Sequence, residues 1–441
     1  MWGIPAFLIL AVIGFIFAKM AIDAYLRSDG FRLFVAKKAG DTLRSQCDLA
    51  PLQFTGVNAY TDEFKANGSA EAPFAQLSLE QFRAEISLRR FFEHVWQVEQ
   101  VDVQKLRVNF EGPRVDLLEP APSAAEKTAA VNEKPGWLPN RVEIGSASVH
   151  DTSLLWKGGS LHGTFLKLTP NDGGWNIEGS SGKIEQEGLP PLDVQKLRLL
   201  ARGQSVFIKE AEFRQGNEGA IKVTGEVGIG DHLDIQTAIE NMSLTPFLSG
   251  DWRVRLKGNV SGEVKVRSPL PVDPAGLPYS GTLRLTRGEL TALPVLDQIA
   301  TFTALQQFRH LMLTRAEGDF QQDGKKLQVS KFVMESEGLI RIEGAFTVEN
   351  SMIDGSFQLG VIPTSLQWLP GSRTKVFIET RGGYVWSPMR LSGPVSNPKE
   401  DLTPRLIAAM QGAVIEGAQN AVEQGVKTGR DAIKGALDLL K

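Results

Sequence analysis

The stretches Trp252-Arg253-Val254-Arg255-Leu256-Lys257 and Val264-Lys265-Val266-Arg267 decide the fold expected of this chain, because apolar and charged side chains alternate in both. The same alternation recurs in Thr282-Leu283-Arg284-Leu285-Thr286, in Leu327-Gln328-Val329-Ser330 and in Ile340-Arg341-Ile342-Glu343. Successive side chains of a β-strand point to opposite faces, so each stretch predicts a strand with one apolar and one wet face. A sheet built from such strands needs a cover for its apolar face.

Alternation of this kind extends, with interruptions, from Arg141 to Pro394. The 44 glycines fall mostly where such stretches end, as turns and bulges between short strands require. The chain is therefore predicted to be mostly β, with antiparallel strands. The alternating residues also fit an ordinary closed sandwich, in which they would form the core.

The N-terminus reads as a membrane anchor. Trp2 to Ala18 contains no charged residue, and Met20-Ala21-Ile22 extends the apolar run. Residues 2–22 are long enough to cross a bilayer as a helix, so residues 1–23 are predicted to be a single transmembrane segment. A cleavable signal peptide is the alternative, but no Lys or Arg precedes the run and no clean cleavage site follows it. The basic residues that follow the run would, by charge alone, keep the large domain in the cytoplasm.

Composition shifts divide the rest of the chain. Residues 24–118 are predicted to be an α+β region, and the Pro-, Ala-, Glu- and Lys-rich residues 119–140 a linker. Residues 141–400 form the predicted β region, interrupted by a capping helix at 294–313 with an apolar residue at every third position. Residues 401–441 are predicted to be a long amphipathic helix, which needs the open sheet, a partner or a membrane interface to lie on.

One short sequence occurs twice. Asp-Val-Gln-Lys-Leu-Arg stands at 102–107 and again at 193–198. Both copies lie in predicted strands, which suggests a repetitive sheet built from similar units.

The chain carries no recognisable catalytic motif. It lacks paired Cys-x-x-Cys, His-Glu-x-x-His, nucleophile-elbow and Walker sequences, and its five histidines are scattered. Cys47 is the only cysteine, which excludes an intramolecular disulfide. A net charge of -3 without a basic patch gives no sign of nucleic-acid binding. No catalytic residue, cofactor or metal ligand is therefore predicted, and the protein is not expected to be an enzyme.

Several segments resemble a known family. Asp29-Gly-Phe-Arg-Leu-Phe-Val-Ala-Lys-Lys-Ala-Gly follows the apolar run, and Val98-Glu-Gln-Val-Asp-Val-Gln-Lys-Leu-Arg-Val comes later. Further along stand Met242-Ser-Leu-Thr-Pro-Phe-Leu, Ile342-Glu-Gly-Ala-Phe and Leu391-Ser-Gly-Pro-Val-Ser-Asn-Pro. Together they resemble the AsmA-like proteins of bacterial envelopes, of the AsmA/TamB type within the bridge-like lipid-transfer superfamily. The resemblance covers roughly residues 1–118 and 200–400, and its motifs are loose.

The resemblance implies a single-pass inner-membrane protein with most of its chain in the periplasm. Its sheet would be elongated and curled into an apolar groove, and phospholipid acyl chains in that groove would cover the face the protein leaves bare. Other envelope proteins would be further partners, and the process served would be outer-membrane and envelope biogenesis. The candidate groove-lining residues are Val254, Leu256, Val264, Val266, Leu283, Leu285, Leu327, Val329, Ile342, Phe346, Phe357 and Leu359.

A second function stays open. The wider family also suggests a scaffold or assembly factor for outer-membrane proteins, which would pair an exposed β edge with client strands. Lipid binding uses the apolar face of the sheet, whereas this alternative uses its edge.

Overall fold

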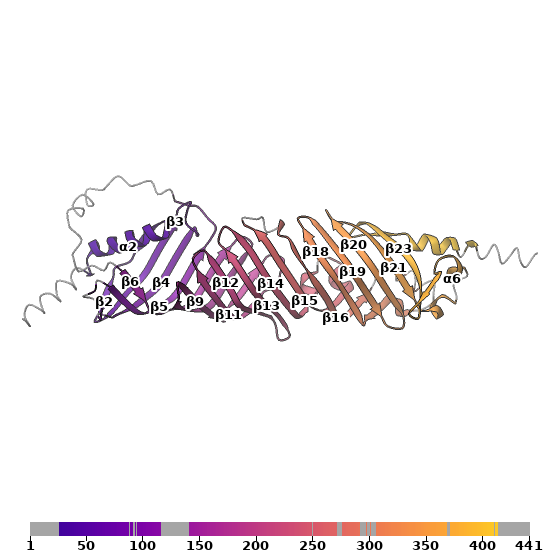
Figure 1. Ribbon diagram of the computed structural model, residues 1–441, viewed down its shortest axis with the longest axis horizontal. Helices are drawn as coiled ribbons and strands as arrows, with labels where there is room; N and C mark the ends of the chain where they lie inside the picture. Colours follow the sequence, from indigo (N-terminus) through magenta and orange to yellow (C-terminus); the bar gives the residue numbers. More distant parts are fainter. Residues whose placement is uncertain are drawn as a thin grey trace, which may run out of the picture. The chain divides into compact units, whose positions relative to one another are not determined.

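The computed structural model describes residues 26–87, 89–90, 93, 95–115, 141–248, 250–270, 276–291, 297, 300, 306–367, 371–409 and 411–412. This part of the chain is mostly β: it forms a large, curled, mainly antiparallel sheet with few helices (Figure 1). The chain divides into two compact units, the first reaching Asn217 and the second running on from Gly230. Strand β13 (Gly219–Gly228) contains the division between them.

The first unit begins with a helix and continues as strands. Its elements are α2 (Asp29–Leu43), β1 (Ser45–Leu49), β2 (Gln53–Thr55), β3 (Asn58–Gly68), β4 (Gln76–Ser87), β5 (Val95–Asn109), β6 (Arg141–Ile144), β7 (Ala147–Trp156), β8 (Gly159–Asn171), β9 (Gly174–Ser180), β10 (Lys183–Gln186), β11 (Leu192–Arg202) and β12 (Ser205–Gln215).

Helix α2 begins with a capped first turn. The hydroxyl of Ser28 accepts a hydrogen bond from the backbone N–H of Phe31 over 3.2 Å, which caps the first turn. The helix ends at Arg44, whose φ of 52° lies in the left-handed region. The ring of Phe31 lies 6.5 Å from that of Phe54 and 6.1 Å from that of Trp96, so the helix packs on the first strands.

Neighbouring strands of the first unit pair antiparallel with one exception. β5 pairs in parallel with β6 and with β7, which the prediction of an antiparallel sheet had missed. A parallel pair cannot be joined by a hairpin. The connection from β5 to β6 spans the 31 residues from 110 to 140. The sequence showed that this connection is long, but not that the strand after it runs parallel to β5.

The second unit contains the alternating stretches. Its elements are β14 (His232–Ser243), η2 (Thr245–Phe247), α4 (Trp252–Arg255), β15 (Leu256–Pro269), β16 (Tyr279–Thr291), η4 (Gln306–Arg309), β17 (His310–Leu313), β18 (Arg315–Asp323), β19 (Lys326–Ser336), β20 (Ile340–Glu349), β21 (Met352–Val361), η5 (Pro363–Leu366), α6 (Ser372–Lys375), β22 (Glu379–Arg381), β23 (Tyr384–Pro394) and β24 (Lys399–Glu400).

These strands follow one another in space as they do in sequence. β14, β15, β16, β18, β19, β20, β21 and β23 pair antiparallel in that order (Figure 1). β17 pairs with the last residues of β16. β22 and β24 pair with the two ends of β23, on the side that β21 leaves free.

Two sequence expectations about this unit were wrong. Residues 252–255 form the short helix α4, not a strand, and β15 begins only at Leu256. Gly250 precedes this helix with φ 55°, and Trp252 packs against the core. A turn that packs a partly buried tryptophan against the core therefore overrides the short alternation of Trp252-Arg253-Val254-Arg255.

The capping helix expected at 294–313 was wrong in its second half. Asp297 and Ala300 are helical, but residues 306–309 form the 3₁₀ helix η4 and residues 310–313 form strand β17. Leu311 and Leu313 are buried and alternate with exposed neighbours, which is a strand pattern. Apolar residues at every third position fit a helix, so the sequence did not reveal the change to the period-two alternation of a strand.

Residues 402–409 are helical, which confirms the start of the predicted C-terminal helix. Residues 413–441 lie outside the described residues, as do the predicted anchor at 1–23 and the predicted linker at 119–140. Among the helices that the structure describes, none has the length and apolar character needed to cross a membrane.

Candidate ligand-binding face

Strand registers in the second unit bring apolar side chains together on one side of the sheet. Directly opposed residues of paired strands point to the same face. One row of opposed residues runs Gly281, Phe320, Val329, Phe346, Gly355 and Leu391. A second row runs Leu285, Ala316, Met334, Ile342 and Leu359. We call the side that carries these two rows the apolar face.

The structure places the predicted lining residues on this face with one exception. Those on it are Leu256, Val264, Val266, Leu283, Leu285, Leu327, Val329, Ile342, Phe346, Phe357 and Leu359. Val254 is the exception: it stands on α4, and 71% of its surface is exposed.

The protein itself covers half of the apolar face. Phe308, Leu366, Phe377 and Leu402 come from the segments that connect or follow the strands, and they pack on the sheet in one core cluster. Among the predicted lining residues, Phe357 and Leu359 belong to that cluster, and Leu256, Leu285, Ile342 and Phe346 pack against it. We call this part, toward the ends of β16, β19 and β21, the covered half.

In the described part of the chain, the core cluster does not extend over the other half of the face. Leu327 and Val329 near the start of β19, Leu283 on β16, and Val264 and Val266 on β15 are half-buried and do not belong to the core cluster. Phe320 on β18 lies among them, opposite Val329. We call this part the open half. It is where an apolar ligand could contact the sheet without displacing the side chains of the core cluster.

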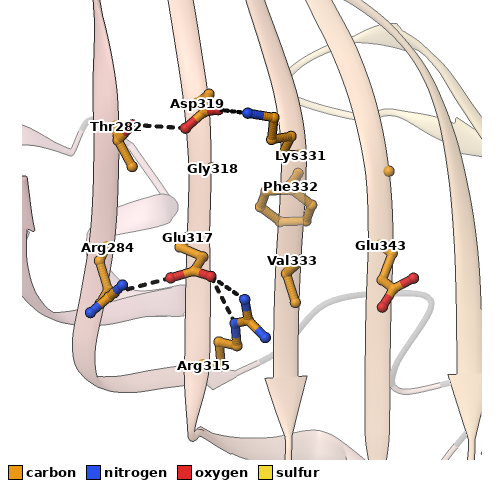
Figure 2. Close-up of a pocket in the computed structure, with 11 residues that line it drawn as sticks. Thr282, Arg284, Arg315, Glu317, Gly318, Asp319, Lys331, Phe332, Val333 and Glu343 are labelled. Carbon is orange, nitrogen blue, oxygen red and sulfur yellow. Dashed lines mark hydrogen bonds and ion pairs between the residues drawn. The ribbon is translucent and has the colours of Figure 1, made fainter. Parts of the chain in front are cut away.

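The opposite face of the same strands is charged, and its charges pair with one another (Figure 2). Nε of Arg284 lies 3.0 Å and Nε of Arg315 lies 2.8 Å from the carboxylate of Glu317. The Arg315 hydrogen bond is the main cause that lowers the pKa of Glu317 below its usual value. Lys331 lies 2.9 Å from Asp319, which lowers the pKa of that carboxyl and raises the pKa of Lys331.

These side chains surround a hollow of about 480 Å³ on the charged face. Glu343, on its far side, pairs with Arg341 at 2.7 Å and with Arg381 at 2.9 Å. The hollow's carboxylates thus already have cationic partners. Mutual pairing of this kind is typical of a solvated sheet surface, so the apolar face remains the better candidate site.

Metal binding and nucleophilic chemistry find little support in the described residues. Among them, no group of three or more His, Cys, Asp or Glu side chains converges to hold a metal ion. Burial raises the pKa of the Cys47 thiol, which disfavours the reactive thiolate. His232 lies 2.8 Å from Asp231 and His310 lies 3.7 Å from Glu289, in two separate surface pairs.

The first unit carries an apolar row that the sequence reading had not singled out. Phe64, Leu79, Leu106, Thr152 and Thr164 oppose one another across β3, β4, β5, β7 and β8. Gln81, whose φ is 53°, interrupts the alternation of β4 between Leu79 and Phe82. An alternation search that allowed one such interruption would have found this row.

Comparison with known proteins does not assign the chain to a family. No protein-family model matches the chain, and no significant match was found among curated protein sequences.

Proposed function

We propose that this protein is a membrane-anchored envelope protein of the AsmA-like type that binds or conducts phospholipid acyl chains along the apolar face of its sheet. The observation that carries the proposal is the open half, where five predicted lining residues lie half-buried on one continuous face. Burying a CH₂ group there contributes about 0.8 kcal/mol. An acyl chain would therefore bind without any special polar residue.

Other features support the same proposal. The apolar run at residues 2–22 would hold the sheet at the inner membrane with its bulk in the periplasm, as the family resemblance implies. The charged face is internally paired, which suits contact with water.

The alternative is a scaffold that pairs an exposed sheet edge with client strands. The edge at β23 is poorly suited to such pairing. β22 and β24 occupy the two ends of that edge. Between them Pro388 offers no N–H, and the N–H of Arg390 donates to the carboxylate of Asp401 over 2.8 Å. Short strands, proline and capped N–H groups are the usual means by which proteins block edge pairing.

A photocrosslinking experiment on the full chain tests the proposal. A photoreactive phenylalanine derivative replaces Val329, on the open half, in cells whose phospholipids carry radioactive phosphate. The matched control places it at Gln328, the next residue, which faces the charged side. Labelling at Val329 and not at Gln328 is expected. Equal lipid labelling at the two positions would contradict the proposal. Crosslinks from Val329 to other protein chains, without lipid labelling, would favour the scaffold alternative.

A further inference from the structure

The chain enters the first unit at one end of its sheet. Helix α2 begins there: the ring of Phe31, in its first turn, lies 6.5 Å from that of Phe54 on β2 and 6.1 Å from that of Trp96 at the start of β5. Just before the helix, Nη2 of Arg27 donates to the carbonyl of Phe54 over 2.9 Å. The entry point therefore lies beside β2 and the start of β5.

Strand registers bring further strand ends to the same place. Val57 stands in the turn from β2 to β3, and its carbonyl accepts a hydrogen bond from the N–H of Ile86, near the end of β4, over 2.8 Å. Ile86 opposes Val98 on β5, and Trp96 opposes Val142 on β6. We call this end, formed by the β2–β3 turn, the end of β4 and the starts of β5 and β6, the anchor end of the first unit.

The anchor end lies close to the bilayer when residues 1–23 cross it as predicted. Four residues lead from Asp23 to Arg27. A chain spans at most about 3.6 Å for each residue, so Arg27 lies no more than about 14 Å from the end of the anchor. By contrast, β5 runs for 15 residues to Asn109, which places the far end of the strand about 46 Å away at about 3.3 Å for each residue.

Exposed side chains at the anchor end suit a bilayer surface. Val57 is 44% and Val142 is 55% exposed, although both are apolar. Arg27, at the entry point, and Arg89, just after β4, are exposed as well. At a membrane interface, apolar side chains enter the boundary between headgroups and acyl chains, and arginines lie among the phosphates.

Ion pairs within the protein reduce the repulsion that acidic residues at this end would exert on phosphates. The carboxylate of Asp29 lies 3.4 Å from Arg32, and that of Glu93 lies 2.9 Å from Arg90. Nη1 of Arg90 also lies 2.7 Å from Glu143 on β6, which fixes the segment after β4 to that strand. The surface is therefore preformed, and little order has to be gained on contact with lipid.

We propose that the anchor end docks on the surface of the bilayer that holds residues 2–22, with Val57 and Val142 inserted beside the headgroups and Arg27 and Arg89 at their phosphates. This inference rests on the membrane anchoring in the proposed function, and it adds which part of the folded sheet meets the lipid. It would also bring the apolar side of the first unit's sheet next to the bilayer, because Ile144, which is 36% exposed, opposes Val98 of that unit's core cluster.

Fluorescence of the full chain in lipid nanodiscs tests the docking. The discs contain phosphatidylcholine and phosphatidylglycerol, with or without a nitroxide on the headgroup. Cys47→Ser removes the native thiol, and an environment-sensitive fluorophore is then attached through Val57→Cys or Val142→Cys. At both positions we expect emission at shorter wavelength than from an exposed site in water, and loss of that emission in the nitroxide discs.

Leu155→Cys is the matched control. Leu155 is also apolar and 47% exposed, but it opposes Asn109 at the far end of β5. Its emission should stay at long wavelength and should not be quenched. Equal quenching at all three positions, or none at Val57 and Val142 while the protein remains in the discs, would overturn the docking and leave the anchor intact. A full chain that does not enter the discs would overturn the membrane anchoring, and the docking with it.

Discussion

Tyr384 at the start of β23 donates its hydroxyl proton to Oε1 of Glu335 at the end of β19, over 3.0 Å and across the two strands that separate them. β20 and β21 lie between these two strands, so the bond joins residues of strands that are not neighbours in the sheet. Glu335 also lies 3.4 Å from Arg341, so the tyrosine joins an ion pair on β19 and β20.

Replacing Tyr384 by phenylalanine tests this bond through pH. Burial, and then the hydrogen bond to Glu335, raise the pKa of Tyr384 above its ordinary value. Stability from this group is therefore present below the unfolded pKa of about 10 and is lost as pH rises through the higher folded pKa. Tyr384→Phe should cost about 1 kcal/mol at neutral pH, and the difference from wild type should shrink in alkali.

Urea unfolding of wild type and variant, at neutral pH and above about pH 10, measures the effect. Tyr279→Phe removes an exposed tyrosine hydroxyl from the same unit and serves as the control. A Tyr384→Phe deficit that grew with pH would contradict the assigned bond.

Glu317 on the charged face gives the opposite pH dependence. Hydrogen bonds from Arg315 and Arg284 lower its pKa, so its contribution is present above the unfolded pKa of about 4.3 and is lost as pH falls through the folded value. Glu317→Gln should destabilise the protein by about 1 kcal/mol or less near neutrality and flatten the acid side of its stability profile. Denaturation midpoints against pH, with the exposed Glu349→Gln as control, would show this. An unchanged acid profile would mean that the ion pairs contribute nothing.

Period-two alternation predicted the strands well where nothing interrupts them. It also gave the face: apart from Val254, the candidate lining residues lie on one side of the sheet. The repeated Asp-Val-Gln-Lys-Leu-Arg lies in two strands, as expected, and in each strand its Lys and Arg pair with a glutamate. Lys105 and Arg107 approach Glu80 at 3.9 and 3.0 Å, and Lys196 and Arg198 approach Glu210 at 2.9 and 3.3 Å.

What the sequence could not predict depends on distant residues. Leu285 and Leu327 look alike in an alternating strand, yet only Leu285 packs against the core cluster. The difference arises because Phe308, Leu366 and Leu402 pack on one half of the face. The parallel pairing of β5 with β7 could not be predicted either, because the relative direction of two strands depends on the segment that connects them and not on the strands themselves.

The helical segment at 402–409 should contribute to the stability of the second unit. Leu402 is 0% exposed and sits in the core cluster, and two N–H groups at the start of the segment donate to the carboxylate of Glu400. Leu402→Ala should cost about 2–5 kcal/mol. Ile407→Ala, at a position 41% exposed on the same segment, should cost about 0.5 kcal/mol or less. Urea titrations compare them, and equal losses would mean that the segment does not pack as described.

Thr152 on β7 and Thr164 on β8 oppose each other and are 0% exposed, and neither hydroxyl oxygen has a hydrogen-bond partner among the residues that the structure describes. A buried hydroxyl without a partner costs about 1–3 kcal/mol, and replacing both by apolar groups of the same shape removes that cost. The double variant Thr152→Val with Thr164→Val should therefore raise the melting temperature. Thr61 is equally buried, but its hydroxyl donates to the carbonyl of Ala50 over 3.1 Å. Thr61→Val should lower the melting temperature, so differential scanning calorimetry should give shifts of opposite sign. A loss of stability in the double variant would show that the two hydroxyls hydrogen-bond to something, such as a buried water or a ligand's polar group.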